Sequence, residues 1–285
     1  MIIFFNYWSF YYNMYFRQRL EQIQQNHVQT QDKINTWNET QTNVKKKKAL
    51  LIGCNYRGTK YALHGCINDT KLMEKLLKDK FNFNSVTTMT DDTEKKPNKT
   101  EILEAVEDLI KNARENDFLY IYFSGHGIQI DDLNNDENDG KDESYVSLDF
   151  QKVIDDELYS IVKKHDKNIK IMFMFDCCHS GTIMDFPYNL YGSSSSSIHK
   201  FKANCICLSG CRDQQYSYES QLGQSRHGAL TYFFNEIMTT VNGPFTYKFL
   251  MNRLQDKLSR SNFNQNVQIS STKSIPWDSA RFVFF

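Results

Sequence analysis

The sequence has no net charge, no long apolar run and no cysteine spacing that repeats as a zinc knuckle. Its 34 lysines and arginines equal its 34 aspartates and glutamates, so composition gives no reason to expect a nucleic-acid partner. No stretch reaches the length of an apolar transmembrane helix, which argues against a stable membrane span. The 285 residues, of which 40% are hydrophobic, can bury a substantial core in one large α/β domain or two small ones.

The seven cysteines are odd in number and scattered along the chain. A disulfide framework is typical of short secreted chains with paired cysteines, whereas this pattern is typical of a reducing compartment. We therefore expect a cytoplasmic protein. Cys205 and Cys207 alternate within an apolar run, which predicts that both lie in the core of a strand.

The first 47 residues differ in composition from the rest of the chain. Residues 1–16 are strongly aromatic but lack the basic start and the small-residue cleavage site of a secretory signal. A short membrane-facing anchor, a pro-segment and an upstream artefact of start-site choice all stay open. Residues 17–48 are rich in Gln, Asn and Thr and end in four lysines, which predicts a linker that leads into the first strand. We expect a flexible extension over residues 1–47 and a folded domain over residues 48–285.

Apolar runs alternate with amphipathic segments along the folded part. Continuous runs predict buried strands at residues 49–53, 85–89, 118–123, 169–175 and 204–208. Apolar residues at helical spacing predict helices over residues 68–80, from a cap at Asn98 or Thr100 to Ile110, and over residues 155–164, 227–240 and 245–258. The last six residues, 280–285, also predict a strand. This alternation is typical of an α/β fold with a mostly parallel sheet and helices on both faces.

Two reactive motifs follow neighbouring predicted strands. "SGHG" places His126 after the third strand, and "DCCHSG" places Cys177 and Cys178 after the fourth. Because sites in parallel sheets lie beyond the carboxyl ends of strands, we expect both motifs at one edge of the sheet. A histidine can take the proton of a thiol near neutral pH, which would let the sulfur attack a peptide carbonyl. The alternative is a cysteine in the core and a structural histidine.

Five stretches occur in an order that resembles one protein family: "ALHGCINDT", "YFSGHGIQI", "FDCCHSG", "LSGCRDQQYSYE" and "GALTYFF". They resemble the metacaspases, the caspase-like cysteine peptidases of protists, fungi and plants, and the similarity runs from about Lys48 to the C-terminus. The short distance between the cysteines and Asn204 is similar to that in the short-linker, type I-like members. The resemblance implies a caspase-like α/β/α sandwich, with Cys178 as nucleophile, Cys177 at a variable position and His126 as the catalytic histidine. A caspase proper matches less well, because the sequence lacks the QACxG pattern.

The resemblance also implies cleavage after Arg or Lys. The residues that match the family's substrate pocket are Cys66, Asp69, Ser124 and Asp176. Two carboxylates converging beyond the strand ends would suit a guanidinium, which binds a planar acidic partner. The alternative for Asp69 is that it caps the helix that follows it.

A further implication of the resemblance is activation by calcium. The matching metal positions are Asp142, Asp155, Asp156 and Asp185. Hard oxygen ligands from several loops suit calcium better than zinc. The acidic stretch over residues 131–143 is similar to an EF-hand loop in composition but lacks its order, and its alternative is a solvated acidic loop.

Taken together, the motifs predict a calcium-dependent cysteine endopeptidase that acts on peptide or protein substrates as a monomer. Two features depart from the family pattern: His64 stands where an arginine is common, and residues 1–47 match no proline-rich prodomain. One alternative is a latent scaffold or regulatory protein, although the chain keeps both the thiol and the imidazole. A legumain-like transpeptidase is another, and the acidic pocket argues against it.

Overall fold

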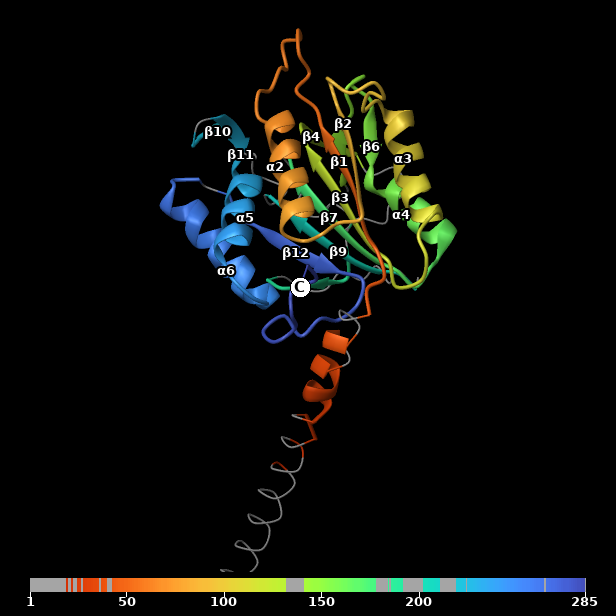
Figure 1. Ribbon diagram of the computed structural model, residues 1–285, viewed down its shortest axis with the longest axis vertical. Coiled ribbons are helices and arrows are strands. Elements are labelled where there is room, and N and C mark those ends of the chain that lie inside the picture. The colour runs from red at the N-terminus through yellow and green to blue at the C-terminus, as the bar shows by residue number, and fades with distance from the viewer. Residues whose placement is uncertain are drawn as a thin grey trace, which may run out of the picture.

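A seven-stranded sheet crosses the described part of the chain in this computed structural model (Figure 1). The structure describes residues 43–131, 141–177, 184, 186–191, 202–210, 219–223, 225–263 and 265–284, and before them residues 19, 22, 25, 26, 28–35 and 37–39. The strands lie in the order β2-β1-β3-β7-β9-β12-β8. Their bounds are Lys47–Gly53 for β1, Ser85–Thr90 for β2, Phe118–Ser124 for β3, Lys170–Asp176 for β7, Tyr188–Asn189 for β8, Asn204–Ser209 for β9 and Gln268–Ser271 for β12.

The five strands from β2 to β9 are parallel, and β12 and β8 extend the sheet antiparallel at one edge. Every residue of the two central strands, β3 and β7, is buried. Alternate side chains of β3 point to opposite faces, so that Tyr122 lies in one core cluster and Phe123 in the other. The mostly parallel sheet predicted from continuous apolar runs is confirmed.

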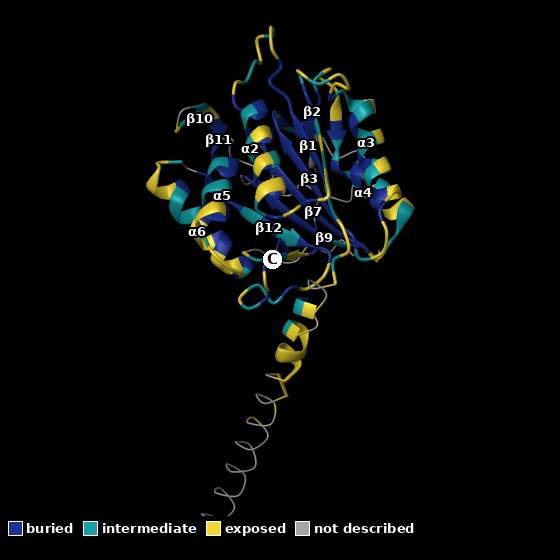
Figure 2. Cartoon of the chain, in the orientation of Figure 1, coloured by how far each residue is buried: buried dark blue, intermediate teal, exposed yellow. Residues whose placement is uncertain are grey.

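Helices cover both faces of the sheet (Figure 1). One face packs against α2 (Cys66–Asp79), α5 (Ala229–Thr240) and α6 (Tyr247–Arg260), and the other against α3 (Lys99–Lys111) and α4 (Asp155–His165). Figure 2 shows the buried sheet between helices whose outer turns are exposed. The helix spacing predicted all five, each to within two residues at either end. Asn98 is the N-cap residue of α3, although its side chain forms no capping hydrogen bond.

Two small sheets border the strand ends, and the sequence predicted neither. One is the antiparallel set β4 (Gly127–Asp131), β5 (Lys141–Val146) and β6 (Lys152–Ile154), and the other is the pair β10 (Glu219–Leu222) and β11 (Ser225–Gly228). β5, β10 and β11 are too polar to show the apolar alternation of a half-buried strand, and the alternation of Ile128 and Ile130 in β4 is too short to predict one. They matter for function because β4 begins directly after His126 and β11 leads directly into α5.

The strand predicted over residues 280–285 is wrong. Among the described residues this segment contributes only an isolated bridge, between Thr246 and Arg281. Its aromatic side chains instead fill the core, where the Phe284 ring lies 4.9 Å from that of Phe81. The sequence also failed to predict β12, the strand between β9 and the edge strand β8, whose four residues include only one large apolar side chain, Ile269. Such a short, mostly polar run has too little apolar periodicity to predict a strand.

Part of the N-terminal extension is attached to the domain. Residues 28–35 and 37–39 are helical, and Trp37 is buried, with its ring 6.0 Å from that of Tyr247. Its indole N–H donates to the Arg281 carbonyl, and the Arg281 N–H donates to the Asn38 side chain. Sequence analysis predicts a flexible segment here, because one tryptophan in a polar stretch gives no periodic hydrophobic pattern. The boundary between residues 47 and 48 itself stays a prediction.

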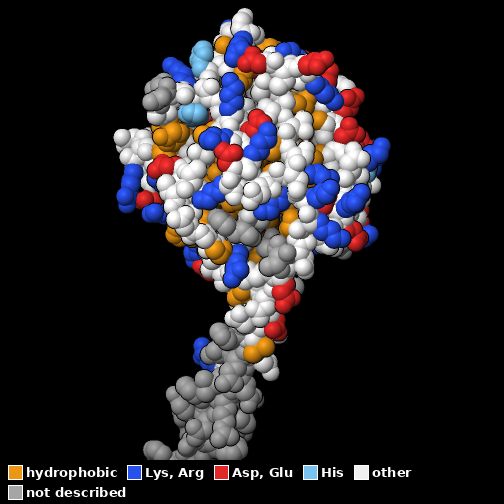
Figure 3. All heavy atoms as spheres, in the orientation of Figure 1, with side chains coloured by type: hydrophobic (Ala, Val, Ile, Leu, Met, Phe, Trp, Pro, Cys, Tyr) orange, Lys and Arg blue, Asp and Glu red, His pale blue; other side chains and the backbone are white. Residues whose placement is uncertain are grey.

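Charged side chains of both signs are mixed over the face of the molecule in Figure 3. This agrees with a sequence whose net charge is zero. Within the part of the chain that the structure describes, no helix is both long and apolar enough to cross a membrane.

Candidate active site

The two reactive motifs follow strands that are direct neighbours. In the pairing of β3 with β7, Ser124 lies opposite Asp176. His126 and Cys178 are each two residues beyond this pair, so their chains leave the sheet from points that lie about 4.8 Å apart. Cys178 and the five residues after it lie outside the described residues, as does Asp185. The pairing of sulfur with imidazole therefore stays a prediction, whereas the adjacency of the two strand ends is established.

The imidazole of His126 is held in one tautomer. Its Nε2 lies 2.8 Å from the Tyr61 carbonyl oxygen, which can only accept, so in the neutral ring Nε2 carries the proton and Nδ1 has the lone pair. The ring also packs on Tyr56, with centroids 4.8 Å apart. A histidine held in this way presents Nδ1 as a base.

Tyr56 fixes the backbone of His126. Its hydroxyl accepts a hydrogen bond from the His126 N–H at 3.0 Å and donates to the Val146 carbonyl at 2.6 Å. Tyr56 has a φ of 49°, a left-handed conformation that is costly for a bulky residue and that is often found near functional sites. Gly125 is required here, because an added Cβ would lie 2.8 Å from the Tyr56 hydroxyl.

Asp69 is fully buried at the start of α2 and accepts three hydrogen bonds. The donors are the Ser124 hydroxyl at 3.0 Å, the Gly228 N–H at 3.0 Å and the His227 Nδ1 at 2.9 Å. Burial raises the pKa of Asp69 to about 7, and the nearby charge of Asp176 acts in the same direction. The capping alternative is wrong, because the N-cap of α2 is Gly65 and the carboxylate of Asp69 bonds elsewhere.

Asp176 is the last residue of β7, and its carboxylate lies beside the start of α5. Its Oδ2 accepts from the backbone N–H of Thr231 at 2.9 Å and from the hydroxyl of Thr231 at 2.7 Å. Gly228 is required for this approach, because an added Cβ would lie only 2.2 Å from the same oxygen. Asp69 and Asp176 thus place two buried carboxylates at one corner, close enough for the charge of Asp176 to raise the pKa of Asp69.

Cys66, the remaining predicted pocket residue, and Cys177 also lie at this end of the sheet. Cys66 is the first residue of α2 and is buried. An added Cβ at Gly53 would lie 2.6 Å from the Cys66 carbonyl oxygen, so a glycine at the end of β1 lets α2 approach. Cys177 is only 1% exposed and belongs to the core cluster under α3 and α4. Cys177 thus packs inward from the end of β7.

Sequence reasoning missed several residues that complete the site. They are Tyr56, Tyr61, His227, Gly228 and Thr231, which together position the imidazole and the two carboxylates. The stretch "GALTYFF" was recognised as part of the resemblance, but nothing in its composition predicted contacts with Asp69 and Asp176. Those contacts join residues more than 50 positions apart.

The predicted metal ligands are described only in part. Asp155 begins α4 and is 6% exposed, and burial raises its pKa well above the usual value, with Glu143 and Asp156 adding to the shift. Its carboxylate accepts from the backbone N–H of Met184 at 3.3 Å, which brings the neighbour of Asp185 to this corner. Among the described residues no group of three or more acidic, histidine or cysteine side chains has the arrangement of a metal site.

The acidic residues nevertheless fit a hard cation in their chemistry. Burial, and after it the charges of Glu143 and Asp156, raise the pKa of the Asp155 carboxyl, and a divalent cation would offset that cost of ionisation. The strand β5 carries Asp142 beside Glu143, and the Asp142 side chain lies outside the described residues.

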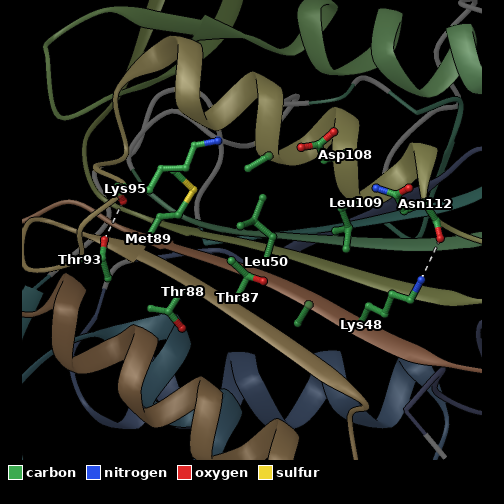
Figure 4. A pocket seen from close by; sticks show the side chains of 12 residues that line it. Lys48, Leu50, Thr87, Thr88, Met89, Thr93, Lys95, Asp108, Leu109 and Asn112 are labelled. Atoms are coloured by element: carbon green, nitrogen blue, oxygen red, sulfur yellow. Dashed lines mark hydrogen bonds between the residues drawn. The ribbon is translucent and has the colours of Figure 1, made fainter.

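A separate hollow of about 400 Å³ lies along the edge strand β2 and its neighbour β1, under α3 (Figure 4). The side chains that line it include Lys48, Leu50, Thr88, Met89 and Lys95. Neither histidine nor cysteine is among its lining residues, and it lies away from the ends of β3 and β7. It therefore has no part in the chemistry of this site.

Comparisons with known proteins agree with the geometry. Residues 47–187 match the family model described as metacaspase, peptidase C14 domain. The chain is 33% identical to Metacaspase-1 of Yarrowia lipolytica, over 80% of this chain and 62% of that protein. It is 32% identical to Metacaspase-1 of Emericella nidulans, over 80% of this chain and 70% of that protein. The chain thus spans between about three fifths and seven tenths of these relatives.

One solved structure shares the fold. A protein from Geobacter sulfurreducens is similar with a TM-score of 0.63 and 22% sequence identity, over 84% of this chain and 97% of that one. At this identity the likeness concerns the fold alone.

A third sequence relative is Metacaspase-1 of Plasmodium falciparum, which is 34% identical over 80% of this chain and 40% of that protein.

Proposed function

The chain belongs to the metacaspase family of cysteine-type endopeptidases, and we propose that it cleaves peptide bonds after arginine or lysine, with Cys178 as nucleophile and His126 as general base. The carrying observation is the register of β3 with β7, from which both motifs emerge side by side. The predicted substrates are peptides or proteins, and the predicted working form is a monomer.

The chemistry follows from the tautomer of His126. With Nε2 donating to the Tyr61 carbonyl, Nδ1 takes the proton of the Cys178 thiol, and the sulfur attacks the substrate carbonyl. Collapse of the tetrahedral intermediate releases the amine, which receives the proton from His126. Water then hydrolyses the acyl-enzyme, with His126 again as base. Tyr56 supports both steps, because it fixes the backbone of His126.

The preference for basic residues is supported by the two buried carboxylates, Asp69 and Asp176. Charge on a substrate side chain would relieve the repulsion between them. An acidic side chain entering the same corner would add a third negative charge and be rejected.

The experiment that tests this function is cleavage of matched fluorogenic peptides that end in Arg, Lys or Asp. We expect hydrolysis of the Arg and Lys peptides and at least about 100-fold slower hydrolysis of the Asp peptide. Preference for Asp, or no hydrolysis of the basic peptides at any calcium concentration, contradicts the proposal.

We further propose that calcium binds at Asp142, Asp155, Asp156 and Asp185 and activates the enzyme. When bound, it would supply the positive charge that lets these carboxylates ionise together. Addition of calcium should raise the melting temperature, by an amount that corresponds to about 2.7 kcal/mol at 100 times the dissociation constant. Asp155→Asn should remove most of this shift and most of the calcium-dependent activity. If neither the melting temperature nor the rate of hydrolysis changes when calcium or a chelator is added, the proposed activation by calcium is wrong.

Binding of a basic peptide should depend on pH through Asp69. Burial raises its pKa from 3.8 to about 7, and only the ionised form attracts a cation. Affinity should therefore rise about tenfold between about pH 6 and about pH 8. His227 of β11 and Asp176 of β7 face the same carboxylate, so the comparison must be made with Asp69→Asn. The measurement is binding of an Arg peptide to Cys178→Ala, which separates affinity from chemistry.

The raised pKa of Asp69 also makes the stability of the folded chain depend on pH. Because the folded pKa of Asp69 lies above the unfolded value, the folded chain holds the extra proton, and this contribution to stability is lost as pH rises towards about 7. Asp69→Asn should flatten both the binding and the stability profiles. A binding profile that keeps its full slope in Asp69→Asn would assign the titration to another group.

A further inference from the structure

The side chain of Gln265 is buried beside Asp176 without a hydrogen bond. Gln265 is 1% exposed, and among the described residues neither atom of its amide group has a hydrogen-bond partner. A buried amide that forms no hydrogen bond loses its hydration without compensation, so such groups are rare. Next to a candidate binding site, an exception of this kind indicates a ligand that completes the bonds.

Gln265 lies against Gly210, the residue that follows β9. An added Cβ at Gly210 would lie 2.8 Å from Gln265 Nε2 and 3.4 Å from Asp176 Oδ1. The amide and the carboxylate therefore flank the same point, where the neighbouring strands β7 and β9 end (Figure 1). Since Thr231 binds Oδ2 of Asp176, Oδ1 is the oxygen on the Gln265 side.

The backbone of Gln265 is held by α6. Gln255 Nε2 donates to the Gln265 carbonyl at 3.0 Å, and Gln255 Oε1 accepts from the Val267 N–H at 3.3 Å. These two bonds fix the segment ahead of β12. The backbone that carries the amide is thus held in place before any substrate arrives, which favours affinity because less order remains to be imposed.

We propose that Gln265 is a specificity-determining residue: when a substrate arginine binds at Asp176, the amide turns about its Cγ–Cδ bond, so that its oxygen takes the place of Nε2 and accepts an N–H of the guanidinium, and this favours arginine over lysine. The inference rests on the proposed function. A guanidinium presents five N–H donors in a planar fork, whereas a lysine ammonium presents three on one nitrogen. A carboxylate with an amide oxygen beside it matches the wider fork, and the ammonium can be satisfied by the carboxylate and water.

The test compares kcat/KM for two peptides that differ only in Arg or Lys before the cut bond. In Gln265→Met, which keeps length and removes both polar atoms, the Arg-to-Lys ratio should fall about tenfold. Gly210→Ala should lower the ratio independently, because its methyl group displaces the end of the Gln265 side chain. Gln268→Met is the matched control, since Gln268 bonds Asn189 on the far edge strand and should leave the ratio unchanged.

The melting temperature separates this role from a structural one. Because Gln265→Met removes an amide that forms no hydrogen bond in the described part of the chain, its melting temperature should equal or exceed that of the parent. If Gln265→Met or Gly210→Ala folds and keeps the parent's Arg-to-Lys ratio, the inference about Gln265 is wrong and the proposed function is unaffected. A parent chain that cleaves neither peptide overturns the inference and the proposed function together.

Discussion

Replacing Cys178 with alanine is expected to lower kcat/KM for an Arg peptide by about 10⁴-fold or more, because the nucleophile is lost. Cys177→Ser is the matched control. Cys177 is 1% exposed in the core, so its hydroxyl replacement should lower the melting temperature by a few degrees and leave kcat/KM within about twofold of the parent. The measurement is the hydrolysis rate of the same peptide by the two folded variants.

His126→Ala completes this comparison. Loss of the base should cost about 10² to 10⁴-fold in kcat/KM. In the double variant, the loss of kcat/KM should be no larger than that of Cys178→Ala alone, because the two groups act as a unit. Full activity in Cys178→Ala, or effects of the two substitutions that simply multiply, would contradict the assigned pair.

Asp176→Asn is expected to have the second largest effect. The substitution keeps the shape and an oxygen that can accept from Thr231, and it removes the negative charge that attracts the substrate cation. Truncating a buried charge partner costs about 2–5 kcal/mol, so kcat/KM for the Arg peptide should fall by at least about 30-fold, mainly through KM.

The matched controls for this prediction are two other aspartates. Asp69→Asn should have a smaller effect, since His227, Ser124 and Gly228 already bond its carboxylate. Asp79→Asn, on the same helix as Asp69 but exposed and paired with Lys75, should change nothing measurable. An Asp176→Asn enzyme with unchanged KM would remove Asp176 from the substrate pocket.

The sequence predicted the sheet and its helices because these signals are local. The continuous apolar runs of β3 and β7, and the helical spacing of α3, each appear within a short window. The strand end carrying His126 and the one carrying Cys178 could be placed at one edge from the rule for parallel sheets alone. The strand predicted over residues 280–285 was wrong, because aromatic residues that fill a core look locally like a strand, and β12 was missed because its run is short and mostly polar.

The contacts that tune the site could not be predicted in the same way. The Tyr61 carbonyl that fixes the tautomer of His126 is a backbone atom, and any residue there would supply one. His227 meets Asp69 only because β11 folds back beside α2. The burial of Gln265 next to Asp176 depends on the absence of a side chain at Gly210. Each of these contacts depends on tertiary structure, which the local periodicity of the sequence does not predict.

The most direct test of the central claim is covalent labelling with a peptidyl chloromethyl ketone that ends in arginine, followed by mass-spectrometric mapping. A thiolate activated by His126 beside a pocket for a cation should yield one adduct, on Cys178, at the same rate as activity is lost. The His126→Ala variant should label far more slowly. Labelling of Cys177 or of another cysteine with Cys178 unmodified, or faster labelling by the matched aspartate reagent, would contradict the account.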